Sequence, residues 1–240
     1  MIMKKSIYIA IISAITVFCI IWGSWYHISG FAENLKERFH MNFSSDKNDP
    51  IVNKSESNII LENFDRIEAD IKVGDFKIVK GDSFKYSYSA NRAWLVPEIK
   101  ITKGTLSIKQ SGKSKTNVGS NNASVTITVP EDTNFSDLDI DVNVGEVNLS
   151  DFFADKINVD VNVGEINLKN VDFNKGEFEV DVGDLQVNGV KDPSSYSLDI
   201  KCSIGDTNAF GNSGKKIKTD VSDKKYINAD IDIGSCELTE

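Results

Sequence analysis

The sequence predicts an all-β protein, a single-stranded β-solenoid with coils of about 19–22 residues, preceded by one N-terminal transmembrane α-helix. Three observations support this fold class. A short segment centred on a glycine recurs along the chain, apolar and polar residues alternate strictly within each copy, and an uncharged apolar run stands near the N-terminus.

The repeat is clearest when the chain is aligned on its recurring glycine. Copies begin at residues 138, 157, 176, 198 and 227, so the period is 19, 19, 22 and then 29 residues. An earlier copy, IEADIKVGDFKIV, occupies residues 67–79. Self-similarity at a fixed period of about 20 residues is typical of a solenoid, because each unit buries its apolar face only by stacking on its neighbours.

Each copy has the pattern of a strand with one face in a core. In the copy that begins at residue 138, Ile140, Val142 and Val144 share one face, which we expect to point inward. A glycine followed by an acidic residue then interrupts the alternation. Glycine accepts the positive φ that a sharp bend needs, so we expect a corner there. The expected corner glycines are Gly74, Gly145, Gly164, Gly183, Gly205 and Gly234.

Equivalent inward positions of successive coils should form apolar stacks. Two such stacks are expected, one of Val142, Val161, Val180, Cys202 and Ile231, and one of Val144, Val163, Val182, Ile204 and Ile233. Residues 80–136 are less regular and contain three β-like runs, which we interpret as wider N-terminal coils of the same solenoid. A separate small β domain is the alternative.

Residues 6–27 are predicted to cross a membrane. The run from Ser6 to Tyr26 is uncharged, and as a helix it spans about 30 Å, the thickness of a bilayer core. Lysines precede it and aromatic residues cluster at its far end, which predicts a cytoplasmic tail at residues 1–5 and an extracytoplasmic remainder. A cleaved signal peptide is the alternative, since Gly30-Phe31-Ala32 has suitable spacing, but the apolar run is longer than a usual signal core.

The remaining chain divides into two parts. Residues 28–58 have the Ser/Asp/Asn/Lys composition of a juxtamembrane linker, and residues 59–240 hold the expected extracytoplasmic domain. The Val/Ile-Gly-Asp/Glu corners on short alternating strands, behind a membrane helix, resemble the bacterial β-solenoid domain family known as "putative adhesin". Similar domains occur in LiaG-type proteins of Gram-positive envelope-stress operons. The resemblance covers about residues 59–240 and implies an envelope protein, but it supplies no residue with a chemical role.

Several function classes are excluded or disfavoured. Both histidines, His27 and His40, precede the domain, so nucleophilic triads and histidine-ligated metals cannot be built in it. No phosphate-binding loop or dinucleotide fingerprint occurs, and we expect no cofactor. A formal net charge of −9 argues against nucleic acid as a partner. A glycosidase with two carboxylates is the least favoured alternative, because a repeated outward column gives every carboxylate the same exposed setting.

Two cysteines fall on inward positions of different coils. Cys202 lies before its corner glycine and Cys236 lies after its own. We expect a buried pair of thiols, and a disulfide is the alternative because the domain is expected outside the cytoplasm.

The acidic residues are concentrated in the middle coils. Residues 137–190 contain three lysines against thirteen aspartates and glutamates, a net charge of −10. If the corners stack, acidic side chains about 4.8 Å apart form two ladders that repel themselves and attract cations. The first ladder is expected to contain Glu146, Glu165, Asp184 and Asp206, and the second Asp141, Asp160 and Glu179.

These ladders have two interpretations. They could only solvate the outer face and keep the strands from pairing with other chains, or they could attract a cationic peptide, a basic envelope protein or a divalent cation. Calcium is the weaker choice, since the nine-residue calcium repeat and the EF-hand loop are absent. The sequence therefore predicts a non-catalytic interaction or sensing module of the cell envelope, and the resemblance implies a role in envelope stress. A structural or adhesive surface domain without a soluble ligand is the alternative.

Overall fold

The structure, a computed structural model, describes residues 51–110, 121–219 and 225–240. These residues form fifteen strands and two short 3-10 helices, η1 (Ala93–Leu95) and η3 (Pro193–Ser195). Neither helix in these ranges is long and apolar enough to cross a membrane, and the predicted span at residues 6–27 lies outside them. The all-β prediction is confirmed for the described chain.

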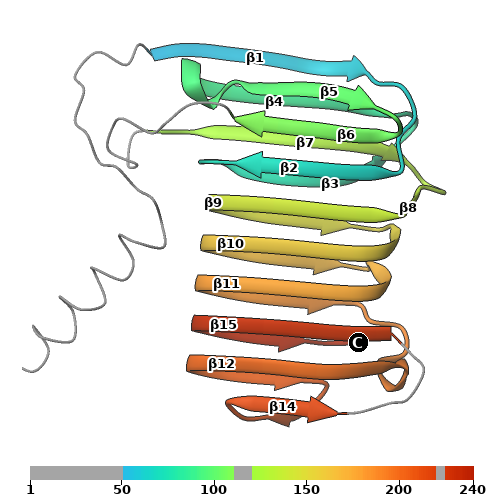
Figure 1. Ribbon diagram of the computed structural model, residues 1–240, viewed down its shortest axis with the longest axis vertical. Coiled ribbons are helices and arrows are strands. Elements are labelled where there is room, and N and C mark those ends of the chain that lie inside the picture. Colours follow the sequence, from blue (N-terminus) through green and yellow to red (C-terminus); the bar gives the residue numbers. More distant parts are fainter. Residues whose placement is uncertain (1–50, 111–120, 220–224) are drawn as a thin grey trace, which may run out of the picture. The chain divides into compact units, whose positions relative to one another are not determined.

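Five long, bent strands form the regular part of the fold. They pair in parallel and in register, so that corner glycine lies beside corner glycine, as between Gly145 and Gly164 or Gly164 and Gly183. Figure 1 shows these strands as a stack of similar hooks. The five are β9 (Asp137–Ser150), β10 (Phe153–Lys169), β11 (Asp172–Asn188), β12 (Tyr196–Ala209) and β15 (Lys225–Leu238).

The copy at residues 67–79 adds a sixth level to the stack. It consists of β2 (Arg66–Ile71) and β3 (Asp75–Gly81), with Gly74 between them. Both strands pair in parallel with β9, β2 with the half before the corner and β3 with the half after it. All six expected corner glycines therefore occupy corners, and their φ angles lie between +132° and +150°.

The spatial order of the last coils differs from chain order. The final strand, β15, lies between β11 and β12, and pairs in parallel with both. In Figure 1 the red β15 separates the two orange strands. The expected stacks therefore hold their residues in a different sequence, with Ile231 between Val180 and Cys202.

The far end of the stack is closed by the segment that leads from β12 to β15. It contains β13 (Asn212–Ser213) and β14 (Lys216–Thr219), which pair antiparallel with the two halves of β12. Strand β15 is consequently inside the stack, and a short antiparallel cap covers β12.

Strands of residues 80–136 belong to the same fifteen-stranded sheet as the regular coils, so a separate β domain is not what forms. On one side the order beyond β3 is β7 (Ala123–Pro130), β4 (Lys85–Arg92) and β1 (Ile51–Ile60); on the other, β6 (Thr105–Gln110) and β5 (Pro97–Thr102) follow β2. The prediction of wider coils is confirmed for β6 and β7, which pair in parallel with β2 and β3, and is wrong for β4 and β5, which pair antiparallel with β7 and β6. β1, β4 and β5 are antiparallel to their neighbours, and the short β8 (Asn134–Phe135) pairs with β10.

The first described strand begins earlier than the expected domain. Residues 51–58 have the composition of a linker, yet they form most of β1, whose residues are almost all exposed on both faces. A strand with so little buried surface has no alternation of apolar and polar residues. Composition is therefore the only sequence signal in this segment, and composition indicates a linker.

The core lies between the two halves of the bent strands. In β9 the buried positions are Leu138, Ile140 and Val142 before the corner and Val147 and Leu149 after it. The interval from residue 142 to residue 147 is odd, so the corner takes up one extra residue and resets the alternation. The second expected stack is therefore wrong as a core column: Val144, Val163, Val182 and Ile233 are half-buried, and Ile204 is 62% exposed.

Candidate interaction surface

The first predicted ladder forms over three neighbouring strands. Glu146, Glu165 and Asp184 directly follow the corner glycines of β9, β10 and β11, and the strand register pairs each with the next. Asp206 is not their neighbour, because β15 places Ser235 between Asp184 and Asp206. Ser235 donates from its backbone N–H and its hydroxyl to Asp184 Oδ1, at 2.7 and 2.6 Å. We call Glu146, Glu165, Asp184 and Asp206 the corner ladder.

The second predicted ladder is longer than expected. Asp141, Asp160 and Glu179 pair in register, and the series continues to Asp70 on β2 and Asp230 on β15. All five residues stand four positions before a corner glycine, a signal that the alignment of copies already contains. We call these five residues the face ladder.

Lysines bound the face ladder at both ends. Asp70 lies 2.5 Å from Lys72 Nζ and 3.7 Å from Lys109 Nζ. At the other end Asp230 lies 3.1 Å from Nζ of Lys201, which holds the equivalent position of β12. The negative charge is thus confined to five consecutive strands.

Burial and the neighbouring charges both affect the titration of Asp141. Partial burial raises the pKa of its carboxyl group, the carboxylates of Asp139 and Asp70 raise that pKa further, and Lys72 opposes the effect. Ionised Asp141 is therefore less stable in the folded chain than in the unfolded chain.

Asp141→Asn is expected to stabilise the domain at neutral pH. Because folding raises the pKa of Asp141, its ionisation lowers stability as pH rises through that pKa, and the gain disappears well below the ordinary value of 3.8. Solvent screening limits the gain to about 0.5 kcal/mol. Urea unfolding of the full chain, at neutral pH and again well below pH 3.8, tests this prediction. Asp132→Asn in the turn after β7 is the control. Equal stability of Asp141→Asn and wild type at neutral pH would contradict it.

Amide side chains separate other acidic positions. Asn158, Asn170 and Asn174 each donate from Nδ2 to the aspartate 19 residues earlier, at distances of 2.8 to 2.9 Å. The period of the sequence therefore appears directly as hydrogen bonds between coils. The corner ladder and the face ladder, by contrast, are places where acidic residues follow one another over three or more strands.

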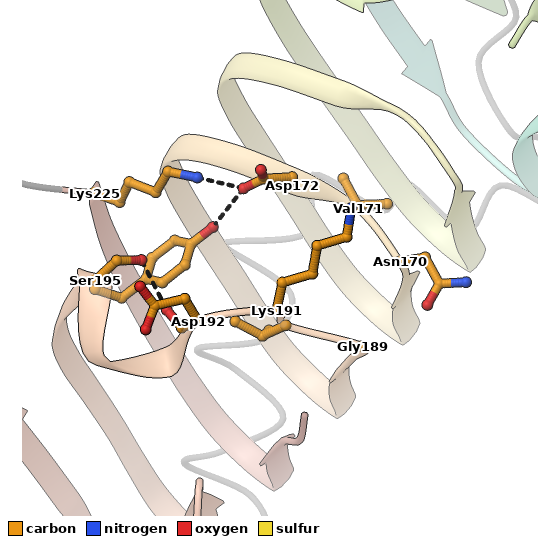
Figure 2. Close-up of a pocket in the computed structure, with 10 residues that line it drawn as sticks. Asn170, Val171, Asp172, Gly189, Lys191, Asp192, Ser195 and Lys225 are labelled. Atoms are coloured by element: carbon orange, nitrogen blue, oxygen red, sulfur yellow. Dashed lines mark hydrogen bonds and ion pairs between the residues drawn. The ribbon is translucent and has the colours of Figure 1, made fainter. Parts of the chain in front are cut away.

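One small pocket lies among the turns opposite the glycine corners (Figure 2). Its volume is about 60 Å³, enough for a few water molecules but far below the size of a usual ligand pocket. Asp172 receives a hydrogen bond from the Tyr196 hydroxyl at 3.2 Å and pairs with Lys225 Nζ. Burial raises the pKa of Tyr196, which stays a proton donor. The polar side chains of this pocket therefore bind one another and hold the turns together.

The acidic clusters and the two thiols are the remaining groups whose arrangement bears on metal binding. In the three described ranges, no group of three or more His, Cys, Asp or Glu side chains could hold a metal ion. Cys202 and Cys236 are free thiols, each 2% exposed, and burial raises the pKa of Cys236 to about 12. Cys202 Sγ donates to the carbonyl of Gly234 at 3.4 Å. The pair agrees with the expected buried thiols.

Comparison with known proteins gives the family. The model of the Toastrack DUF4097 family matches residues 53–235. The chain belongs to this family. No curated protein matches it.

Solved structures of bacterial proteins are similar to this chain. A putative cell adhesion protein from Clostridium sporogenes is 18% identical, with a TM-score of 0.61 over 78% of this chain and 99% of that one. A putative adhesin from Bacteroides fragilis is 15% identical, with a TM-score of 0.36 over 81% and 99%. A putative lipid binding protein from Parabacteroides distasonis is 12% identical, with a TM-score of 0.31 over 80% and 95%. At this identity, the first comparison establishes a common fold.

Proposed function

We propose that this Toastrack domain is a non-catalytic interaction module of the bacterial cell envelope that binds a positively charged partner, as part of a response to envelope stress. Residues 6–27 would hold it in the membrane, with the domain outside. The observation that carries the proposal is the face ladder, in which Asp70, Asp141, Asp160, Glu179 and Asp230 occupy five consecutive strands in register.

The charge distribution supports binding over solvation alone. Solvation requires polar side chains but not acidic ones, and elsewhere on the same coils the chain uses asparagines that bond to aspartates. At the face ladder and the corner ladder it keeps carboxylates in sequence despite their repulsion. A cationic peptide or a basic protein surface would relieve that repulsion over several coils at once.

Neutralising the ladders is expected to abolish binding of a cationic probe. The probe is fluorescent hexalysine, titrated into the full chain in detergent micelles and followed by anisotropy, with empty micelles as the blank. Wild type should bind, and added salt should weaken the complex because exposed charges are screened. The corner variant Glu146→Gln/Glu165→Gln/Asp184→Asn and the face variant Asp141→Asn/Asp160→Asn/Glu179→Gln should each bind at least about tenfold more weakly.

A matched control carries the same change of charge elsewhere. Glu98→Gln/Glu131→Gln/Asp132→Asn removes three carboxylates outside both ladders and should bind hexalysine like wild type. If all three variants lose binding equally, net charge alone is responsible and the ladders are not sites. If wild type does not bind hexalysine at low salt, the proposed function is wrong.

An adhesive role is the second candidate. It is favoured by the shared fold with the C. sporogenes protein described as a putative cell adhesion protein. Adhesion predicts that cells displaying the chain attach to a surface or to one another without a soluble ligand. Attachment that survives neutralisation of both ladders would support this role over the charged interaction.

A further inference from the structure

An apolar stripe runs along the outside of the glycine corners. It is formed by the residue that precedes each corner glycine in β9, β10, β11, β15 and β12. Four of these side chains are half-buried, and the last is 62% exposed. We call these residues the corner stripe; in spatial order they are Val144, Val163, Val182, Ile233 and Ile204.

The chain itself covers the N-terminal continuation of this stripe. Val73 precedes Gly74 as Val144 precedes Gly145, yet Val73 is only 7% exposed. It is buried by Trp94 and Leu95 of η1, and Val144 packs at the border of this cluster. The covering segment is Arg92-Ala93-Trp94-Leu95, so a basic residue stands next to the apolar side chains that do the covering.

The opposite end of the stripe lacks such a cover in the described residues. The capping segment hydrogen-bonds from Gly214 N–H to the carbonyl of Thr207 at 3.2 Å, and the carbonyl of the next residue, Lys215, accepts from Cys202 N–H at 2.9 Å. The cap therefore passes from one side of the corner to the other in a single step. Residues 203–206 of β12 stay outside it, and Ile204 is exposed there.

Carboxylates lie directly beside this exposed apolar surface. Each stripe residue precedes a corner glycine, and on β9, β10, β11 and β12 a residue of the corner ladder follows that glycine, so Val163 and Glu165 flank Gly164. Apolar side chains next to a row of carboxylates complement a segment that carries apolar side chains next to lysine or arginine. The intramolecular cover at Val73 has this composition.

We propose that the corner stripe and the corner ladder together bind a short cationic amphipathic peptide segment of a partner. Apolar side chains of the segment pack on Val163, Val182, Ile233 and Ile204, and its basic side chains contact the corner ladder. This inference rests on the proposed function and adds to it that the partner is amphipathic and not merely charged.

The test compares two labelled peptides of different composition. One alternates leucine and lysine over six residues, and the other is hexalysine; both are titrated into the full chain in detergent micelles, with empty micelles as the blank. Ile204→Ser and Val163→Thr/Ile204→Ser are the variants. Ile60→Ser on β1 is the matched control, because that isoleucine is also exposed, at 76%, and lies outside the stripe.

The leucine–lysine peptide should bind wild type more tightly than hexalysine does. Val163→Thr/Ile204→Ser should weaken it about tenfold, as expected for losing a buried apolar contact, and leave hexalysine unchanged. Ile204→Ser alone should weaken binding of the leucine–lysine peptide severalfold. Because Ile204 is exposed, this single variant should fold normally, so its loss of binding cannot come from a folding defect. If the leucine–lysine peptide binds all variants equally, the inference is wrong. If wild type still binds hexalysine in that case, the proposed function stands. If neither peptide binds wild type, both fail.

Discussion

Gly183→Ala is expected to destabilise the domain by at least about 3 kcal/mol. The φ angle of Gly183 is +145°, a backbone conformation that alanine rarely adopts. A Cβ atom built on Gly183 would lie 1.6 Å from the carbonyl oxygen of Gly164 in the neighbouring coil, and both are backbone positions in a paired ladder. The added methyl group can only be accommodated if neighbouring coils separate. Urea unfolding of the full chain measures the loss.

Gly211→Ala is the matched control for this prediction. Gly211 also has a positive φ, +80°, but nothing lies within 4 Å of its Cβ position. Gly211→Ala should therefore lower the free energy of unfolding only by the cost of the strained backbone conformation, about 1 kcal/mol. If Gly183→Ala were no more costly than Gly211→Ala, close packing of the corners would not be what requires glycine there.

The glycine column illustrates what this sequence predicts well. A fixed period with one glycine per copy determines both the bend and the register, because a shift of one residue would turn every apolar side chain outward. All six corners and the central residues of both ladders are consequently found where the alignment of copies places them. The positions of Asp70 and Asp230 follow from the same alignment.

The corner stripe shows where alternation misleads. Strict alternation places Val144 inward. Because the corner contains one extra residue, Val144 instead lies half-buried at the corner, outside the core. The change of parity between Val142 and Val147 is visible in the sequence, since both are apolar and five positions apart. This odd interval is therefore the sequence signal that predicts the stripe.

The order of the last coils could not be predicted from the apolar pattern. Every copy has the same inward face, so any coil can stack on any other. Polar contacts distinguish the alternatives: chain order would place Asp206 beside Asp184 and Asp199 beside Glu177. With β15 inserted, Asp184 instead receives hydrogen bonds from Ser235.

Further contacts select β15 as the neighbour of β11. The Tyr226 hydroxyl donates to Glu177, and Thr239 Oγ1 donates to Asn188 Oδ1 at 2.8 Å. On its other side, Asp230 pairs with Lys201 of β12. The 29-residue interval before the last copy includes the residues that form the cap on β12, and the last copy then takes its place between β11 and β12. The observed order avoids the pairs Asp184–Asp206 and Glu177–Asp199 but places Asp230 beside Glu179, so the hydrogen bonds of β15 to β11 and the Asp230–Lys201 ion pair are what favour it.

Truncation after residue 224 is therefore expected to disrupt more than the final repeat. If coils stacked in chain order, loss of residues 225–240 would shorten the solenoid by one unit and leave β12 on β11. In the observed order it removes the only parallel neighbour that β12 has among the described strands, and it uncovers β11. Restacking of β12 on β11 would bring Lys201 to Glu179, but it would also bring Asp206 to Asp184 and Asp199 to Glu177, and these two like-charge pairs oppose recovery.

Hydrogen exchange with mass spectrometry separates these outcomes. In the truncated chain, amides of β12 should lose protection by about a hundredfold or more, whereas those of β9 and β10 should keep most of theirs. Deletion of Glu240 alone is the control, because β15 ends at Leu238 and the hydrogen bonds beyond it involve Thr239. Native protection of β12 in the truncated chain would mean that the apolar faces alone hold the stack together. Loss of protection confined to β12 and the newly exposed β11 would instead show that β15 is an interior strand on which the cap depends.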